Sequence, residues 1–207
     1  MGATGPIADA QADADAQAEA LALFGTTQSV APARRLVAGA LSCEFSEGQL
    51  RDIRWDDVEV VRGIADLLRD ADWGTVPAVF GEPEVSVSAR HFDVRFEMRM
   101  ATPGGTLACR AHLHGSAEGT LHFEVVAVLD ATMKTNRCGF VVLHPAAAAA
   151  CALQVEHTGG GLEDTVFPGL ISPSQPVFDI RALRYAPAAG VELEVRLEAE
   201  LPGDPAG

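Results

Sequence analysis

Seven polar side chains that could act together on a small molecule lie between residues 136 and 185. They are His144, His157, Arg137, Arg181, Glu156, Asp179 and Gln175. Prolines and glycines stand beside them, and short apolar runs separate them. Because a polar group that leaves water needs a partner, several such groups along one stretch suggest a shared polar cleft. The alternative is a set of loop residues that satisfy backbone groups, since loops carry both kinds of residue.

The chemistry open to this set is proton transfer together with sugar binding. Histidine transfers protons near neutral pH, so His144 and His157 are the candidate acid and base. Arginine, glutamine and carboxylate side chains hydrogen-bond hydroxyls, so we expect the rest of the set to bind substrate. Trp73 joins the candidate substrate-binding residues because its ring could lie against a sugar, although core packing is the commoner role of a tryptophan.

Three other histidines, His112, His114 and His122, form an alternative metal site. Positions i and i+2 of a strand face the same way, and a turn closing around Ala117 would place His122 opposite His112. Three imidazoles with an open fourth position are a pattern of catalytic zinc sites. Exposed strand positions also carry polar residues for solubility alone, so we expect no metal and no cofactor.

Composition limits the compartment and the partners. The chain has 207 residues, 48% of them hydrophobic, which is enough for one sizeable core. A net charge of −14 argues against nucleic acid and anionic membranes as partners, and no apolar run approaches the roughly 20 residues of a membrane span. The start lacks the basic and apolar regions of a signal peptide, and the four cysteines have the irregular spacing of free thiols. We therefore expect a cytoplasmic protein.

Alternation of apolar and polar residues predicts a chain of short strands. We expect them at 40–46, 50–55, 58–61, 85–88, 92–100, 106–114, 120–129, 139–143, 152–156, 178–185 and 191–201. Only 62–72 has the pattern of a helix. Strands separated by turn-length gaps imply an all-β fold, an antiparallel β-sandwich or supersandwich with at most one or two short helices.

Three regions are expected along the chain. Residues 1–35 are rich in alanine and aspartate and form a disordered or helical leader. Residues 36–202 form the sandwich, and residues 203–207 form a short tail.

Five sequence blocks follow one another in an order and spacing typical of a known family. They are WGTVP at 73–77, NRCGFVVLHP at 136–145, VEHT at 155–158, FP at 167–168 and ISPSQPVFDIRA at 171–182. These blocks resemble the N-terminal β-rich domain of the D-apionate lactonase family, and the resemblance covers about residues 36–200. It implies a bacterial hydrolase of apiose catabolism, in which a barrel domain follows the β-rich domain. This chain ends at Gly207, before such a barrel.

Two functional hypotheses follow. In the first, the chain is a β-sandwich module that contributes to a sugar-lactone site or to an interface with a barrel domain or partner chain. If the family's catalytic carboxylates lie in the barrel, this module does not catalyse alone. In the second, the chain is a stand-alone mutarotase-like sugar epimerase or lactone hydrolase, with His144 and His157 converging on one pocket. A structural domain whose histidines tie loops together is the third possibility.

Overall fold

The computed structural model describes residues 6–27, 32–170 and 174–199. Contacts divide the chain into two units, residues 1–32 and 33–207. The first unit holds the helix α1 (Pro6–Phe24), so the leader is helical there. Proline suits the first helical position, and the helix ends where the Gly25 N–H, at a φ of 70°, donates to the Leu21 carbonyl. The predicted tail at 203–207 lies outside the described residues.

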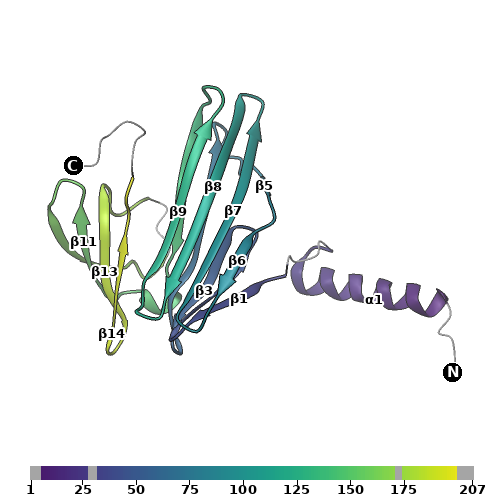
Figure 1. The fold of residues 1–207 in the computed structure, drawn as a ribbon, viewed down its shortest axis with the longest axis horizontal. Coiled ribbons are helices and arrows are strands. Elements are labelled where there is room, and N and C mark those ends of the chain that lie inside the picture. Colours follow the sequence, from purple (N-terminus) through teal and green to yellow (C-terminus); the bar gives the residue numbers. More distant parts are fainter. Residues whose placement is uncertain (1–5, 28–31, 171–173, 200–207) are drawn as a thin grey trace. The chain divides into compact units, whose positions relative to one another are not determined.

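The second unit consists of three antiparallel sheets (Figure 1). Sheet A has the order β1-β2-β3-β4-β10, with the strands Arg34–Ala38, Leu41–Ser46, Gln49–Trp55, Val58–Asp70 and Thr135–Leu143. Sheet B has the order β5-β7-β8-β9, with the strands Ala78–Phe80, His91–Thr102, Gly105–Ser116 and Leu121–Leu129. The strand β6 (Glu84–Val87) also pairs with β7.

Sheet C is the smallest of the three. It has the order β12-β11-β13-β14, with the strands Leu162–Val166, Ala152–His157, Ile180–Ala188 and Val191–Arg196. A short 3-10 helix, Ala146–Ala148, precedes it. The prediction of an all-β antiparallel sandwich is thus confirmed. No helix in the described part of the chain is long and apolar enough to cross a bilayer.

The prediction of a helix at 62–72 is wrong, because most of this segment belongs to β4. Ile64 and Leu68 are four residues apart, a spacing that fits one face of a helix and one face of a strand equally well. Pairing on both sides decides for the strand, since Leu50 of β3 lies opposite Ile64 and Cys138 of β10 lies opposite Leu68. The short strands β1, β5 and β12 are additions to the predicted set.

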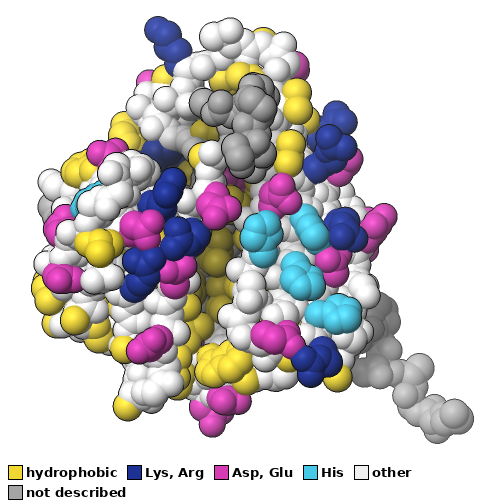
Figure 2. All heavy atoms as spheres, turned by 60° about the vertical axis from the view of Figure 1, so that its left-hand side comes forward, with side chains coloured by type: hydrophobic (Ala, Val, Ile, Leu, Met, Phe, Trp, Pro, Cys, Tyr) yellow, Lys and Arg dark blue, Asp and Glu magenta, His cyan; other side chains and the backbone are white. Residues whose placement is uncertain are grey.

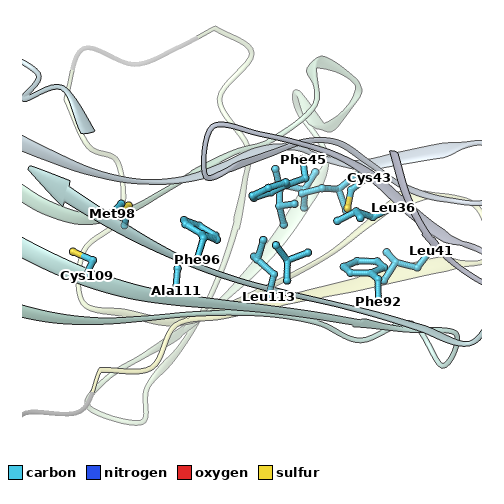
Figure 3. Packing of buried hydrophobic residues seen from close by; sticks show 14 of the residues in the cluster. Leu36, Leu41, Cys43, Phe45, Phe92, Phe96, Met98, Cys109, Ala111 and Leu113 are labelled. Atoms are coloured by element: carbon cyan, nitrogen blue, oxygen red, sulfur yellow. The ribbon is translucent and has the colours of Figure 1, made fainter. Parts of the chain in front are cut away.

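Sheets A and B pack face to face around one hydrophobic core (Figure 3). The alternation along β7 buries Phe92, Val94, Phe96, Met98 and Met100 on one face, as predicted. Figure 3 shows side chains of sheet A, including those of β1 and β2, opposite those of β7 and β8. Sheet C adds the inward side chains of β14 to this core and has a smaller cluster of its own.

Gly115 provides a sharp test of this packing. It lies opposite Phe92, and a Cβ atom there would come within 2.1 Å of the Phe92 ring. Phe92 is fully buried and has no space to move away. We predict that Gly115→Ala destabilises the fold by about 1–3 kcal/mol, which lowers the Tm by several degrees in a circular dichroism melt.

The matched control is Gly159→Ala, because nothing lies within 4 Å of a Cβ at that position. Its Tm should stay close to that of the wild type. Equal melting of the two variants would contradict the packing of Phe92 over Gly115.

Candidate functional site

His144 follows β10 and lies where sheet C meets sheet A. Its Nδ1 is 2.9 Å from the Tyr185 hydroxyl, and that hydroxyl donates to the Val60 carbonyl at 2.9 Å. Because the only hydroxyl proton goes to the carbonyl, the hydroxyl accepts from His144, and Nδ1 therefore carries the ring proton. Phe167 packs against the rings of both His144 and Tyr185, with centroids 4.8 Å apart in each pair.

This arrangement makes His144 a connecting residue between sheets. Burial lowers the pKa of its imidazole below the ordinary value, so the ring is neutral at neutral pH. Nε2 is left as the nitrogen that could accept a proton, and no hydrogen bond joins it to a described residue.

His157 ends β11 and has an acceptor at each ring nitrogen. Nδ1 lies 2.9 Å from the Phe178 carbonyl oxygen, and Nε2 lies 3.1 Å from Glu163 Oε2. The His157 ring is therefore held between a loop carbonyl and a carboxylate.

The two imidazoles contact opposite ends of β11. His144 packs on Phe167, whose backbone N–H donates to the Cys151 carbonyl just before the strand begins. Cys151 and His157 are six residues apart, which spans about 20 Å in an extended chain. The structure thus does not bring His144 and His157 into one pair, and their roles as acid and base stay a prediction.

The other predicted residues near His157 lie in the chain just before β13 and, for Arg181, at the start of that strand. Thr158 N donates to the Asp179 carbonyl at 2.7 Å, and Asp179 has a φ of 54°. Gln175 donates to the Val177 carbonyl at 2.8 Å. Asp179, Gln175 and Arg181 are exposed, so this loop gathers beside the β11–β12 hairpin without forming a closed cleft. Residues 171–173 of the same sequence block lie outside the described residues.

Glu156 belongs to a network of charges on sheet C, and Figure 2 shows arginine and acidic side chains grouped on the surface. It accepts from Arg184 at 2.5 Å and from Arg196 at 3.5 Å, and Glu194 accepts from the same two arginines at 2.6 and 3.0 Å. The hydrogen bond from Arg184 lowers the pKa of Glu156 below its ordinary value. Glu156 is therefore committed to partners within the sheet.

Trp73, in the turn after β4, lies beside Arg137, near the start of β10. The Arg137 guanidinium stands 5.7 Å from the centre of the Trp73 ring, a cation–π distance. Asn136 donates to the Ala71 carbonyl at 2.6 Å and holds the start of β10 against this turn. Trp73 is 54% exposed, so one ring face stays available.

The predicted metal-site histidines lie on the outer face of sheet B, where Figure 2 shows a group of histidines. Their expected register is wrong, because His114 lies opposite His122 and His112 lies opposite Glu124. The turn closes one residue later than Ala117. His112 Nε2 instead meets Asp93 Oδ2 at 2.6 Å. Among the described residues, no group of three or more such side chains is arranged to hold a metal ion.

Asp93 draws these groups together. Burial raises the pKa of its carboxyl, but the His112 hydrogen bond and the charges of His112, Arg95 and His114 outweigh burial and leave the pKa below its ordinary value. The result is a surface ion cluster, with Arg95 Nη1 at 2.8 Å from Asp93 Oδ1.

Sheet A contains an interruption that we call the window. β3 pairs with β4 as far as Leu50 opposite Ile64. β10 occupies the other edge of β4 from Gly63 to Asp70. The next pairing on the β3 side is therefore the bridge between Arg69 and Thr75. Residues 65–67 have no described strand beside them on that edge, and a pocket of about 700 Å³ opens there.

The window has apolar walls and a polar rim. Its walls include Leu50, Ile64, Val76, Phe80 and Met100, and its polar lining includes Glu47, Gln49, Arg51, Arg62, Asp66 and Thr75. A pocket of this size and mixture is typical of small-molecule sites.

Asp66 is the residue that sequence reasoning missed. It lies on the inward face of β4 between Ile64 and Leu68, and both of these side chains pack in the core. No hydrogen bond or ion pair joins its carboxylate to a described residue. Burial raises the pKa of Asp66 to about 6. The signal in the sequence was that Asp66 lies two residues from Ile64 and two residues from Leu68. In a strand these three side chains share one face, but in a helix they do not.

The charge of Asp66 affects the pKa of two cysteines, the buried Cys109 and the exposed Cys138. Burial raises the pKa of Cys109 to about 11, and the Asp66 charge adds to that effect. Burial and then Asp66 also raise the pKa of Cys138. No cation of the described residues contributes to the pKa of Asp66, so its carboxylate is uncompensated.

Comparisons with known proteins point to one family. The family described as D-apionate lactonase, N-terminal domain, matches residues 21–201. The D-apionate lactonase of Brucella anthropi is 38% identical over 180 residues, which cover 86% of this chain and 30% of that relative. The chain thus spans about 30% of the length of this curated relative. No solved structure matches the chain significantly.

The connecting role of His144 leads to a pH-dependent prediction. Its folded pKa lies below its ordinary value, so the stability from its neutral ring is present above that value and is lost as the pH falls below about 6.5. His144→Asn removes this dependence. We predict that His144→Asn lowers the free energy of unfolding by about 1–2 kcal/mol at pH 7.5, which lowers the Tm below that of the wild type. The difference between the two proteins should be smaller at pH 5.5.

The control is His122→Asn, which removes an exposed imidazole from β9. A difference between wild type and His144→Asn that grows as the pH falls would contradict the burial of a neutral ring.

Proposed function

Because the chain belongs to the family of D-apionate lactonase N-terminal domains, we propose that it is the N-terminal β-sandwich region of a protein that hydrolyses a sugar-derived lactone. In this proposal the region does not catalyse alone. It contributes to the lactone site or to the interface with the rest of the protein, whose length is indicated by the relative. We further propose that such a protein acts in sugar catabolism, because the curated relative is a D-apionate lactonase.

The observation that carries the proposal is that each predicted acid–base group already has hydrogen-bond partners within the chain. His144 donates to Tyr185, His157 lies between Phe178 and Glu163, and Glu156 is paired with two arginines. A general acid and base need to share one substrate within hydrogen-bond reach, and these groups contact different parts of sheet C. A module that supports a site completed elsewhere fits this distribution better than a stand-alone epimerase.

The edge strands β9 and β10 support an interface with the rest of the protein. Each ends its sheet on the same side of the sandwich, and Phe123 of β9 packs on Phe140 of β10 with ring centroids 4.9 Å apart. Both strands carry exposed apolar side chains, namely Val126, Val128, Leu129, Phe140 and Leu143. Figure 2 shows a hydrophobic furrow beside the histidine-bearing surface. Concentrations of exposed apolar residues mark interaction surfaces.

A domain replacement tests this proposal. The region of the Brucella anthropi relative that matches this chain is replaced by the chain itself, and hydrolysis of the lactone of D-apionate is followed by acid release. We predict that the chimera keeps activity within about tenfold of the relative, a loss of at most about 1.4 kcal/mol, while the isolated chain shows only spontaneous hydrolysis.

Two variants make the interface claim specific. Val126→Lys and Val128→Lys, both at exposed positions of β9, should lower the activity of the chimera. Val79→Lys should leave it unchanged, because Val79 is exposed on β5 at the opposite edge of sheet B. Turnover by the isolated chain that His144→Asn or His157→Gln abolishes would favour the stand-alone enzyme, and a folded but inactive chimera would contradict the module.

A further inference from the structure

We propose that the window in sheet A is a binding site for a neutral, hydroxylated ring of the sugar or sugar-lactone class, with Asp66 as the acceptor of its hydroxyl protons. The choice of this ligand class rests on the proposed function. The existence of the site rests on the geometry of β3, β4 and the segment after β4.

The first argument is the unused hydrogen-bonding capacity of Asp66. Asp66 is half-buried. A carboxylate that is drawn out of water in a folded protein usually has partners, yet no described residue bonds this one. No fully buried side-chain oxygen or nitrogen in the described chain lacks a partner, so the Asp66 oxygens are reached from the window. A ligand hydroxyl entering there would supply the missing donor.

The second argument is the charge of the window. Its lining holds two acids, Glu47 and Asp66, and two arginines, Arg51 and Arg62, so the formal charges of the lining sum to zero although neither arginine pairs with Asp66. Arg62 is held by Glu59 at 2.7 Å, and Arg51 donates to Gln49 at 3.3 Å. The Asp66 carboxylate would repel a phosphate, and the two arginines would repel an amine. The balance favours a neutral ligand.

The third argument is the combination of an apolar wall with a polar rim. Phe80, Met100 and Val76 present carbon atoms to the pocket, while Gln49 and Thr75 present polar groups. Sugar rings bind to such surfaces because their C–H faces pack on apolar groups while their hydroxyls form hydrogen bonds.

The window is too short for a peptide strand. On the open edge of β4, own-chain pairings stand at Ile64 and at Arg69. These residues are five apart, about 17 Å of extended chain, and the chain closes the gap at both ends. A strand that adds to a sheet needs a longer free edge, whereas a pocket of about 700 Å³ suits a small molecule.

The test measures binding of D-ribono-1,4-lactone to the full chain by ligand-observed NMR, with γ-butyrolactone as the analogue that lacks hydroxyls. We expect the hydroxylated lactone to bind and γ-butyrolactone not to bind. Asp66→Leu should weaken binding at least about tenfold, as expected when a ligand loses a hydrogen bond to a charged group. The control Glu192→Gln changes an exposed acid on β14 and should bind as the wild type does.

A second variant guards against misfolding of the first. Ala65→Phe places a large side chain in the lining of the window without altering Asp66, and it too should reduce binding at least about tenfold. Equal binding by wild type and both window variants would overturn the proposal, as would the absence of binding by the wild type.

The binding test and the domain replacement can fail separately. If the chimera is active while the chain does not bind the lactone, the module is supported and the window site is wrong. If the chain binds the lactone through the window while the folded chimera is inactive, the window site is supported and the module is wrong.

Discussion

The inward face of β4 packs into the core between sheets A and B, and the same face carries the carboxylate of Asp66. An ionised carboxylate that leaves water without a partner costs several kcal/mol, and Asp66 has no partner among the described residues. The chain meets this constraint by ending the β3 pairing at Leu50 and by returning beside β4 only at Thr75. The carboxylate is then reached through the window, and its pKa rises to about 6.

This arrangement lowers stability at neutral pH. The folded pKa of Asp66 lies above its ordinary value of 3.8, so the unfolded chain releases the proton first as the pH rises. The carboxyl therefore destabilises the fold progressively as the pH rises from about 4 to about 6, and that penalty stays at pH 7. An apolar residue would pack here without it. Groups that are kept at a cost to stability concentrate at functional sites, and this is the physical reason for placing ligand chemistry at Asp66.

β4 also anchors sheet C. The Tyr185 hydroxyl donates to the Val60 carbonyl, and His144 donates to that hydroxyl. One strand thus joins β3, β10, the segment at Thr75 and the third sheet. The two regions of chemical interest, the aromatic group around His144 and the window around Asp66, are both positioned by this strand.

The sequence predicted those features that depend on local alternation. β7 was predictable because its inward residues repeat every second position, and β4 was not, because Ile64 and Leu68 satisfy both the helix and the strand period. Features set by distant pairing were out of reach. Tyr185 and Val60 are 125 residues apart, and a turn centred one residue later than expected placed His122 opposite His114 instead of His112. The family was predictable because its blocks are contiguous in sequence, as the match over residues 21–201 confirms.

The pKa of Asp66 tests the account most directly. It can be measured by following the side-chain carboxyl ¹³C shift of labelled aspartate through a pH titration, with the signal assigned by its loss in Asp66→Asn. A midpoint near pH 6 is the result that an inward, unpartnered carboxylate requires. A midpoint near 3.8, the ordinary value, would mean that Asp66 faces open water, and it would contradict the role of Asp66 as the unpartnered acceptor of the window.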